Sequence, residues 1–290
     1  MAHKDAELGS AMAAADLGQL YVLSSHSNKS IEEIVKTTKG KGSMLFELDV
    51  RLPEAVRMDL IQRVAQHQCF KGIVINGQYI SGRVTENEWK NDFAILPHLE
   101  CGTLKKYKDT YGNSHLLRDA YGLVDATRFE HQSFDLKQTV SQIKKVRGDL
   151  KVVLKGIMCY EDGLEAMGAG CDAIWVSNGG HLKAKSAPST ISVLPGIIKN
   201  VRAKYAHAEI FVDSGVTRGT DVLKCLAFGA NAVFVSRPVM WGIHMNGYQG
   251  CHEEMTMLNE ELKLCMALTH CFNLSMVTEK QVIHMIKPRL

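Results

Sequence analysis

The sequence predicts an α/β fold built around a parallel sheet. Short runs rich in β-branched residues recur along the 290-residue chain, and helical patterns lie between them. Each run is nearly continuous in apolar character, which is typical of strands that are buried on both faces. Strands that alternate with helices of about 10–15 residues indicate βαβ units, and these units build a parallel sheet.

Seven strands are expected from these runs. They are Leu20–Ser25, Met44–Val50, Lys71–Asn76, Lys151–Ile157, Asp172–Asn178, Glu209–Gly215 and Ala232–Pro238. A TIM-type (β/α)₈ barrel needs eight strands, and the first helix expected here, Asp5–Leu17, begins almost at the initiator methionine. We therefore expect a TIM-type barrel that lacks its first strand, with two unpaired edges where the barrel should close.

Helix-start signals lie between the strands. Ser30 followed by Glu33 is a capping-box arrangement, and further helices are expected to open at Pro53, Asp135 and Glu161. The remaining helices are expected over 188–204, over 219–228 and in a long terminal stretch from about Cys251.

The connection from Gly77 to Phe134 breaks this regular spacing. It is long and polar, and rich in Gly, Asn, Lys and Asp. Inside a compact fold, such a connection is usually a functional lid or a mobile segment. We treat residues 1–290 as one barrel domain with residues 77–134 as a lid or irregular insertion, because α/β barrels often reach this length as single units.

Composition excludes other classes of protein. With 46% hydrophobic and 22% charged residues, the chain is neither disordered nor a small disulfide scaffold. A net charge of +3 argues against a nucleic-acid partner, and no apolar run is long enough for a membrane span. The eight cysteines form no CxxC pair and the histidines show no metal-binding spacing, so we expect reduced core thiols and no metal.

Two neighbouring segments suggest an anion site, Val212–Lys224 and Val233–Pro238. Gly215 and Gly219 let backbone N–H groups approach a ligand, and a helix is expected to start near Gly219. Arg218 or Arg237 could add a charge-assisted contact to a phosphate. The alternative is a plain strand-to-helix turn that carries a surface arginine.

Polar residues also end the strands, where a barrel of this type carries its chemistry. Lys155 could form a Schiff base or direct positive charge at an electron-rich cofactor, or it could be a surface lysine that follows a strand. His181, after the Gly179–Gly180 turn, could be a general base or an exposed loop residue.

Longer motifs resemble a known family. They are LKGIMCYEDGLEAMGAGCDAIWVSN, SAPSTISVLPGI and FVDSGVTRGTDVLKCLAFGANAVFVSRPVMWGI, with AHKDAELGSAMAAADLGQLYVLSS near the start and ELKLCMALTHC near the end. These segments resemble the FMN-dependent 2-hydroxy-acid oxidases, which include glycolate oxidase. The resemblance covers nearly the whole chain. It implies a (β/α)₈ barrel that binds FMN at its carboxyl rim, oxidises an (S)-2-hydroxy acid to a 2-oxo acid and passes the electrons to oxygen.

Part of the family's flavin site is retained. Ser24, Lys155 and Ser177 match positions that contact the isoalloxazine ring, where the lysine would stabilise the anionic reduced flavin. The positions that contact the ribityl chain and the phosphate correspond to Asp213, Gly215 and Arg237. Arg83 lies roughly where the family has an arginine for the substrate carboxylate.

Other positions depart from the family pattern. Gly179 stands where the family has its base histidine, and Leu182 where it has the arginine that clamps the substrate; a deletion that shifts His181 restores neither role. Glu47 replaces a flavin-contacting glutamine and Asp49 a substrate-contacting tyrosine, and we expect these carboxylates to repel flavin and substrate. The other replacements at cofactor positions are Asn76, Ser214, Thr217 and Ser236.

Two hypotheses follow. The first is an oxidase homologue that has lost its activity, or most of it, with FMN binding weakened or lost. The second is an active FMN oxidase of 2-hydroxy acids that uses replacement residues such as His181. A third possibility is a truncated product that does not fold stably alone.

Assembly and location follow only from the resemblance and the last residues. The family's tetramers suggest a homo-oligomer. The C-terminal tripeptide Pro288-Arg289-Leu290 is a variant of the peroxisomal signal, with the cytoplasm as the alternative.

Overall fold

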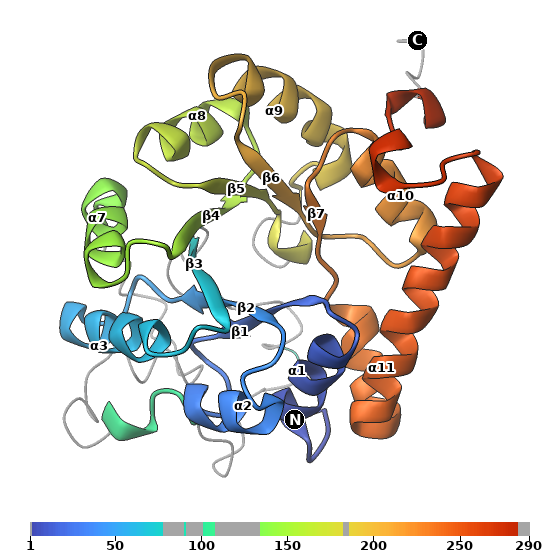
Figure 1. The fold of residues 1–290 in the computed structure, drawn as a ribbon. Coiled ribbons are helices and arrows are strands. Elements are labelled where there is room, and N and C mark those ends of the chain that lie inside the picture. Colours follow the sequence, from blue (N-terminus) through green and yellow to red (C-terminus); the bar gives the residue numbers. More distant parts are fainter. Residues whose placement is uncertain (1, 78–89, 91–100, 108–133, 182–185, 284–290) are drawn as a thin grey trace.

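Seven parallel strands form one sheet, and their hydrogen-bonded order follows the chain (Figure 1). The computed structural model describes residues 2–77, 90, 101–107, 134–181 and 186–283. The strands are β1 (Leu20–Ser24), β2 (Ser43–Leu48), β3 (Phe70–Asn76), β4 (Lys151–Ile157), β5 (Ala173–Val176), β6 (Glu209–Val212) and β7 (Ala232–Val233). All seven predicted strands are present. β7 is the shortest of these strands, and among the described residues it pairs only with β6.

The sheet curls into an incomplete barrel of the TIM type, with helices around its outside (Figure 1). Within the described part of the chain, no strand pairs with the outer edge of β1 or of β7. The prediction of a TIM-type barrel with seven strands is therefore confirmed.

The helices pack on the outer face of the sheet. They are α1 (Ala6–Asp16), α2 (Ile31–Thr38), α3 (Glu54–Ala65), α7 (Leu136–Val146), α8 (Tyr160–Gly168), α9 (Thr190–Lys204), α10 (Gly219–Ala227) and α11 (Arg237–Leu268), with short 3₁₀ turns at Lys105–Tyr107, Gly179–His181, Leu274–Met276 and Glu279–Gln281. The expected capping box opens α2: the Ser30 hydroxyl accepts from the Glu33 amide at 3.2 Å, and the Glu33 carboxylate accepts from the Ser30 amide at 2.8 Å.

The last helix begins earlier than the sequence pattern indicates. α11 starts at Arg237, not near Cys251, and Pro238 occupies its first turn. A break at Asn246 and Gly247 hid this continuity, because Gly247 has φ +54° and interrupts the helical periodicity. α11 packs against α1, so the first and the last α-helix of the described residues lie side by side (Figure 1).

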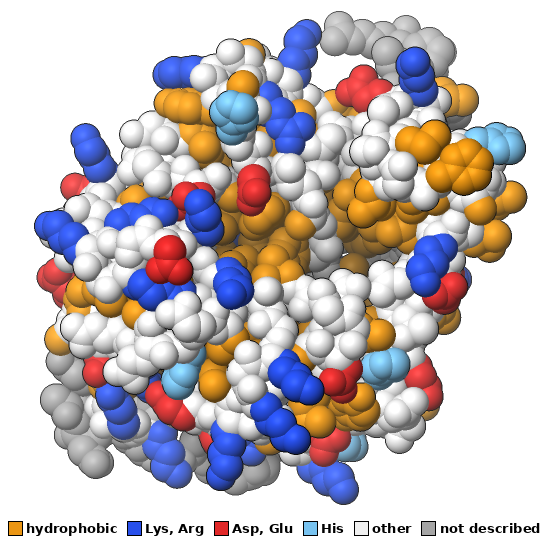
Figure 2. All heavy atoms as spheres, in the orientation of Figure 1, with side chains coloured by type: hydrophobic (Ala, Val, Ile, Leu, Met, Phe, Trp, Pro, Cys, Tyr) orange, Lys and Arg blue, Asp and Glu red, His pale blue; other side chains and the backbone are white. Residues whose placement is uncertain are grey.

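Two apolar layers hold the sheet in place. One face of the sheet meets the helices through fully buried side chains such as Phe46, Ile73 and Val152. The other face fills the barrel interior, where Trp175 stacks on Phe234 with ring centroids 4.0 Å apart. Figure 2 shows a hollow in the face in view that hydrophobic side chains line.

All eight cysteines are free, and six of them are buried. Cys159 is exposed and Cys265 is half-buried. The prediction of core thiols therefore holds for most of them. None of the helices within the described ranges combines the length and the hydropathy that crossing a membrane requires.

Candidate active site

A ring of polar side chains lies above the apolar filling of the barrel. We call it the mouth ring, and it consists of Ser24, Glu47, Asn76, Lys155, Ser177, Asp213 and Ser236. On each strand or its extension the ring residue lies two positions after an inward-facing apolar residue, as Glu47 follows Leu45 and Lys155 follows Val153. Because side chains alternate between the faces of a strand, these seven residues share the inward face.

Lys155 is the central cation of the mouth ring. Its ammonium donates to Glu47 Oε2 at 2.9 Å and lies 3.8 Å from Asp213 Oδ2. It also stands 4.6 Å from the centre of the Trp175 ring, within the range of a cation–π contact. Asn76 Nδ2 donates to the second Glu47 oxygen at 3.1 Å. Lys155 is therefore half-buried between two carboxylates and an aromatic ring.

Asp213 links the ring to the turn that follows β5. Burial raises the pKa of Asp213 above its usual value, against the opposing effect of the Lys155 charge. The Ser214 hydroxyl donates to Asp213 Oδ1 at 2.7 Å and accepts from the Gly180 amide at 3.1 Å. The two segments after β5 and β6 are thus joined by side-chain bonds.

Gly215, in the first segment of the predicted anion site, and Arg237, in the second, are open to a ligand. Arg237 is exposed at the start of α11, and its Nη2 donates to the Gly180 carbonyl at 3.4 Å. Gly215 has φ +80°, and no heavy atom lies within 4 Å of the place where a Cβ would stand. Ser236 precedes the helix without capping it through its side chain. Backbone and guanidinium groups therefore converge here.

The backbone amides of residues 217–219, where the first segment of the predicted anion site starts its helix, already bind the chain's own carboxylates. Asp221 Oδ2 accepts from the amides of Thr217 and Arg218 at 3.2 Å each, and Glu261 Oε2 accepts from the Gly219 amide at 2.8 Å. Arg218 pairs with Glu261 at 2.8 Å. The helix start at Gly219 therefore has its amides bonded within the chain, and Arg218 joins α10 to α11; the expected phosphate contact at Gly219 stays a prediction.

The turn after β5 places its histidine at the surface. His181 is exposed, and its Nε2 lies 3.1 Å from Asn178 Nδ2. Gly179 donates its amide to the Ser177 hydroxyl at 3.2 Å. Leu182 and Arg83, the predicted substrate-clamp positions, lie outside the described residues, as do most of the 77–134 insertion and the C-terminal tripeptide.

A second charged cluster stands beside the mouth ring, and sequence reasoning missed most of it. His26 Nε2 lies 2.7 Å from Asp49 Oδ2, and Arg51 donates to both Asp49 oxygens. Only 2% of the Asp49 side chain is exposed. Burial acts to raise the pKa of Asp49, but the bonds from His26 and Arg51 outweigh it and hold that pKa well below its usual range.

The strand register explains this cluster. Ser24 pairs with Glu47 across β1 and β2, so His26 and Asp49 are the next inward-facing pair beyond the strand ends. The continued alternation of polar residues, Ser24 then His26 and Glu47 then Asp49, was the available signal in the sequence.

The predicted repulsion between these carboxylates and an anion needs correction. Glu47 is neutralised by Lys155, and Asp49 is neutralised by Arg51. An ion pair has little field at a distance because its two charges cancel. The same pairing also means that Lys155 does not offer an uncompensated positive charge.

A parallel sheet that curls into a barrel, with polar side chains gathered where its strands end, defines a TIM-type α/β-barrel protein. Comparison with protein families narrows this class. The family model described as FMN-dependent dehydrogenase matches residues 1–284. The chain belongs to this family.

Curated relatives and solved structures agree with this assignment. The chain is 35% identical to glycolate oxidase 1 of Zea mays over 98% of its own length and 74% of the relative's. It is 32% identical to 2-hydroxyacid oxidase 1 of Mus musculus, over 97% of the chain and 75% of the relative. A crystal structure of mandelate oxidase with (S)-2-phenylpropionate superposes with a TM-score of 0.77 at 29% identity, covering 94% of this chain and 72% of that one.

The residues around the mouth fit FMN as a bound group. The open backbone at Gly215 and the exposed guanidinium of Arg237 suit a phosphate, since both offer donors to an anion. Ser24, Asn76 and Ser177 offer hydroxyl and amide groups on the inward face. The fit is weakest at Lys155, where Glu47 already holds the ammonium.

Proposed function

We propose that this chain is a homologue of the FMN-dependent 2-hydroxy-acid oxidases in which the family's reaction is lost or severely impaired. The ion pair between Lys155 and Glu47 carries this proposal. A lysine that must stabilise negative charge on a reduced flavin needs an uncompensated charge, and here a carboxylate 2.9 Å away cancels it.

Residue identities at the family's reactive positions support the same proposal. Gly179 occupies the position of the base and Leu182 that of the substrate clamp. His181 is turned towards Asn178 at the surface, so it is poorly placed to replace either. Loss of a general base alone lowers a rate by about 10²–10⁴-fold.

FMN, when bound, would supply the hydride acceptor. Ser24, Asn76, Lys155 and Ser177 would lie against its ring, with Glu47 as the counter-ion of the lysine. The ribityl chain and the phosphate would be held by Asp213, Ser214, Gly215, Thr217, Ser236 and Arg237. Gly215 would offer its backbone amide, and each of the other residues has a side chain that donates a hydrogen bond or orients a donor. With Thr217 in place of an arginine, we expect weak binding.

The alternative is an active oxidase of 2-hydroxy acids, and one observation favours it. Asp49 holds the His26 ring by a 2.7 Å bond at Nε2, the arrangement that orients a general base. In that case His26, rather than His181, would take the proton of the substrate hydroxyl at Nδ1, while Arg51 keeps Asp49 ionised.

Flavin absorbance and peroxide production test the two candidate functions. The purified chain is incubated with FMN, desalted and examined for flavin absorbance, and peroxide is measured with glycolate and with lactate. An active glycolate oxidase assayed alongside provides the positive control. We expect little retained flavin and no turnover above the buffer rate. Retained flavin with peroxide production on either acid would overturn the proposal and support the alternative.

Location and assembly are also proposed only by analogy. The tripeptide Pro288-Arg289-Leu290 suggests the peroxisome, and the family suggests a homo-oligomer. Fluorescence microscopy of the chain with its C-terminus left free tests the first, and light scattering tests the second.

A further inference from the structure

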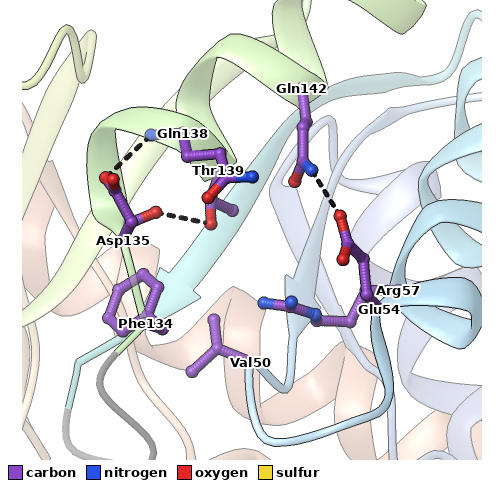
Figure 3. A pocket seen from close by; sticks show the side chains of 8 residues that line it. All are labelled: Val50, Glu54, Arg57, Phe134, Asp135, Gln138, Thr139 and Gln142. Carbon is purple, nitrogen blue, oxygen red and sulfur yellow. Dashed lines mark hydrogen bonds between the residues drawn. The ribbon is translucent and has the colours of Figure 1, made fainter.

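A cavity of about 150 Å³ lies outside the mouth, between the start of α3 and the start of α7 (Figure 3). Eight residues line it: Val50, Glu54, Arg57, Phe134, Asp135, Gln138, Thr139 and Gln142. The mouth ring contributes none of these side chains. The cavity is therefore distinct from the site proposed for FMN, although Val50 directly follows Asp49 in the chain.

Arg57 enters this cavity without a partner for its charge. Figure 3 shows its guanidinium extending from α3 into the space beside Phe134 and Val50. Its Nε is buried and makes no hydrogen bond, and Arg57 forms no ion pair with any residue in the described ranges. Natural structures usually supply an acceptor to a buried donor such as this Nε–H.

Two exposed carboxylates also line the cavity, Glu54 on α3 with Arg57 and Asp135 just before α7. Glu54 Oε1 accepts from Gln142 Nε2 at 2.7 Å, and Asp135 Oδ1 accepts from the Gln138 amide at 2.9 Å. Neither lies within the 4 Å of Arg57 that an ion pair needs. The cavity thus holds one cation and two anions that do not neutralise one another directly.

A ligand with a single charge would suit only part of this arrangement. A simple carboxylate would meet Arg57 but would also face Glu54 and Asp135, whereas a simple amine would face the guanidinium. A molecule that carries both charges satisfies both sides. Val50 and Phe134 add an apolar wall for a small side chain.

We propose that this cavity binds a small α-amino acid. Its carboxylate would accept from the Arg57 guanidinium, its ammonium would donate to Glu54, and its side chain would lie against Val50 and Phe134. The inference is independent of whether the mouth binds FMN or turns over a hydroxy acid.

Calorimetric titration of the full chain tests this site with three kinds of probe. Glycine and L-alanine carry both charges, acetate and propionate carry only the negative one, and methylammonium carries only the positive one. We expect the amino acids to bind and both singly charged probes to bind at least about tenfold more weakly. If acetate bound as tightly as glycine, the proposal that the ligand needs both charges would be wrong. If no probe bound, the proposal that this cavity is a binding site would be wrong.

Three variants assign the binding to the cavity. Arg57→Gln should weaken glycine binding by about tenfold to a hundredfold, and Glu54→Gln should weaken glycine binding but make acetate binding tighter, because one like charge is removed. Glu253→Gln, an exposed carboxylate on α11, is the matched control and should leave binding unchanged. Circular dichroism establishes that each variant is folded. Unchanged glycine binding in a folded Arg57→Gln variant would overturn the proposal.

Discussion

At the carboxyl end of β2, one carboxylate determines the charge that the mouth presents. Glu47 accepts bonds from both Asn76 and Lys155, so it fixes the lysine in place and cancels its charge. A glutamine at this position would keep the bond from Asn76 but would remove the counter-ion. Of the described carboxylates that pair with the Lys155 ammonium, Asp213, 3.8 Å away, would then remain.

Glu47→Gln should therefore strengthen FMN binding. We expect the dissociation constant, measured by quenching of FMN fluorescence, to fall by about tenfold, because the Lys155 charge becomes available to the flavin. Glu253→Gln serves as the control for a simple change in net charge. An unchanged or weaker affinity in Glu47→Gln would show that the ion pair does not limit binding.

The ion pairs of Asp49 lead to a prediction about how the free energy of unfolding depends on pH. Its pKa is lowered in the folded chain by the bonds from His26 and Arg51, in spite of its burial. A carboxyl group with a depressed folded pKa contributes stability above its unfolded pKa of about 3.9 and loses that contribution as the pH falls below it. Asp49→Asn should cost about 1–3 kcal/mol at pH 7, since Arg51 and His26 are only partly buried.

Urea unfolding at neutral pH and near pH 3 measures this effect. The difference in unfolding free energy between the parent chain and Asp49→Asn should shrink at the lower pH, because Asp49 takes up a proton in the unfolded chain while it is still ionised in the folded one. An equal difference at both pH values would contradict the role assigned to the Asp49 ion pairs.

At the scale of the element, α11 depends on a close contact between its own two halves. The break at Asn246 and Gly247 folds the helix so that a Cβ at Gly250 would collide with the Gly242 carbonyl. Gly196, on the exposed face of α9, has no heavy atom within 4 Å of its own Cβ position. Substitution of each glycine by alanine therefore gives a matched comparison, because the Cβ position is blocked at Gly250 and open at Gly196.

Gly250→Ala should destabilise the chain by about 1–3 kcal/mol, because the backbone must move to admit the methyl group. Gly196→Ala should stabilise it by about 0.5–1 kcal/mol, because alanine loses less entropy in a helix. Thermal unfolding of both variants provides the measurement. A neutral Gly250→Ala would mean that the two halves of α11 can separate without cost.

The elements show what a sequence pattern can and cannot supply. Strands were predictable because buried apolar runs are local signals, and the Ser30–Glu33 capping box is local as well. The start of α11 was missed because Gly247 interrupts its periodicity. The carboxylate that accepts from the Gly219 amide belongs to Glu261, a residue 42 positions away, so no local motif could reveal this bond.

The same limit applied to the candidate site. All seven mouth-ring residues could be found from the sequence, because each is a polar residue at the carboxyl end of a predicted strand and side chains alternate between the faces of a strand. The ion pairs and hydrogen bonds between these side chains could not be predicted from the sequence. Lys155 and Glu47 are 108 positions apart, and the bond between His26 and Asp49 depends on the register of β1 and β2.

At the scale of the whole molecule, the described sheet has two edge strands, β1 and β7, and this should produce a gradient of local stability from its centre to its edges. β3 and β4 have partners on both sides, whereas among the described residues β7 pairs only with β6. Strand edges open more easily than strand centres because fewer hydrogen bonds break.

Native-state amide exchange measures this gradient directly. We expect amides in β3 and β4 to exchange much more slowly than those around β7. Equal protection across the sheet would indicate that something covers the free edges in solution. The same experiment on separated oligomeric fractions would show whether a second copy of the chain does so.

The separation between the barrel's apolar filling and the polar layer above it has a wider consequence. Leu45, Val153 and Phe211 secure the fold, while the residues two positions further along each strand contribute little to that packing. Mutations can therefore accumulate in the upper layer without threatening the architecture underneath. Proteins with this architecture can therefore change or lose their catalytic activity during evolution and still fold.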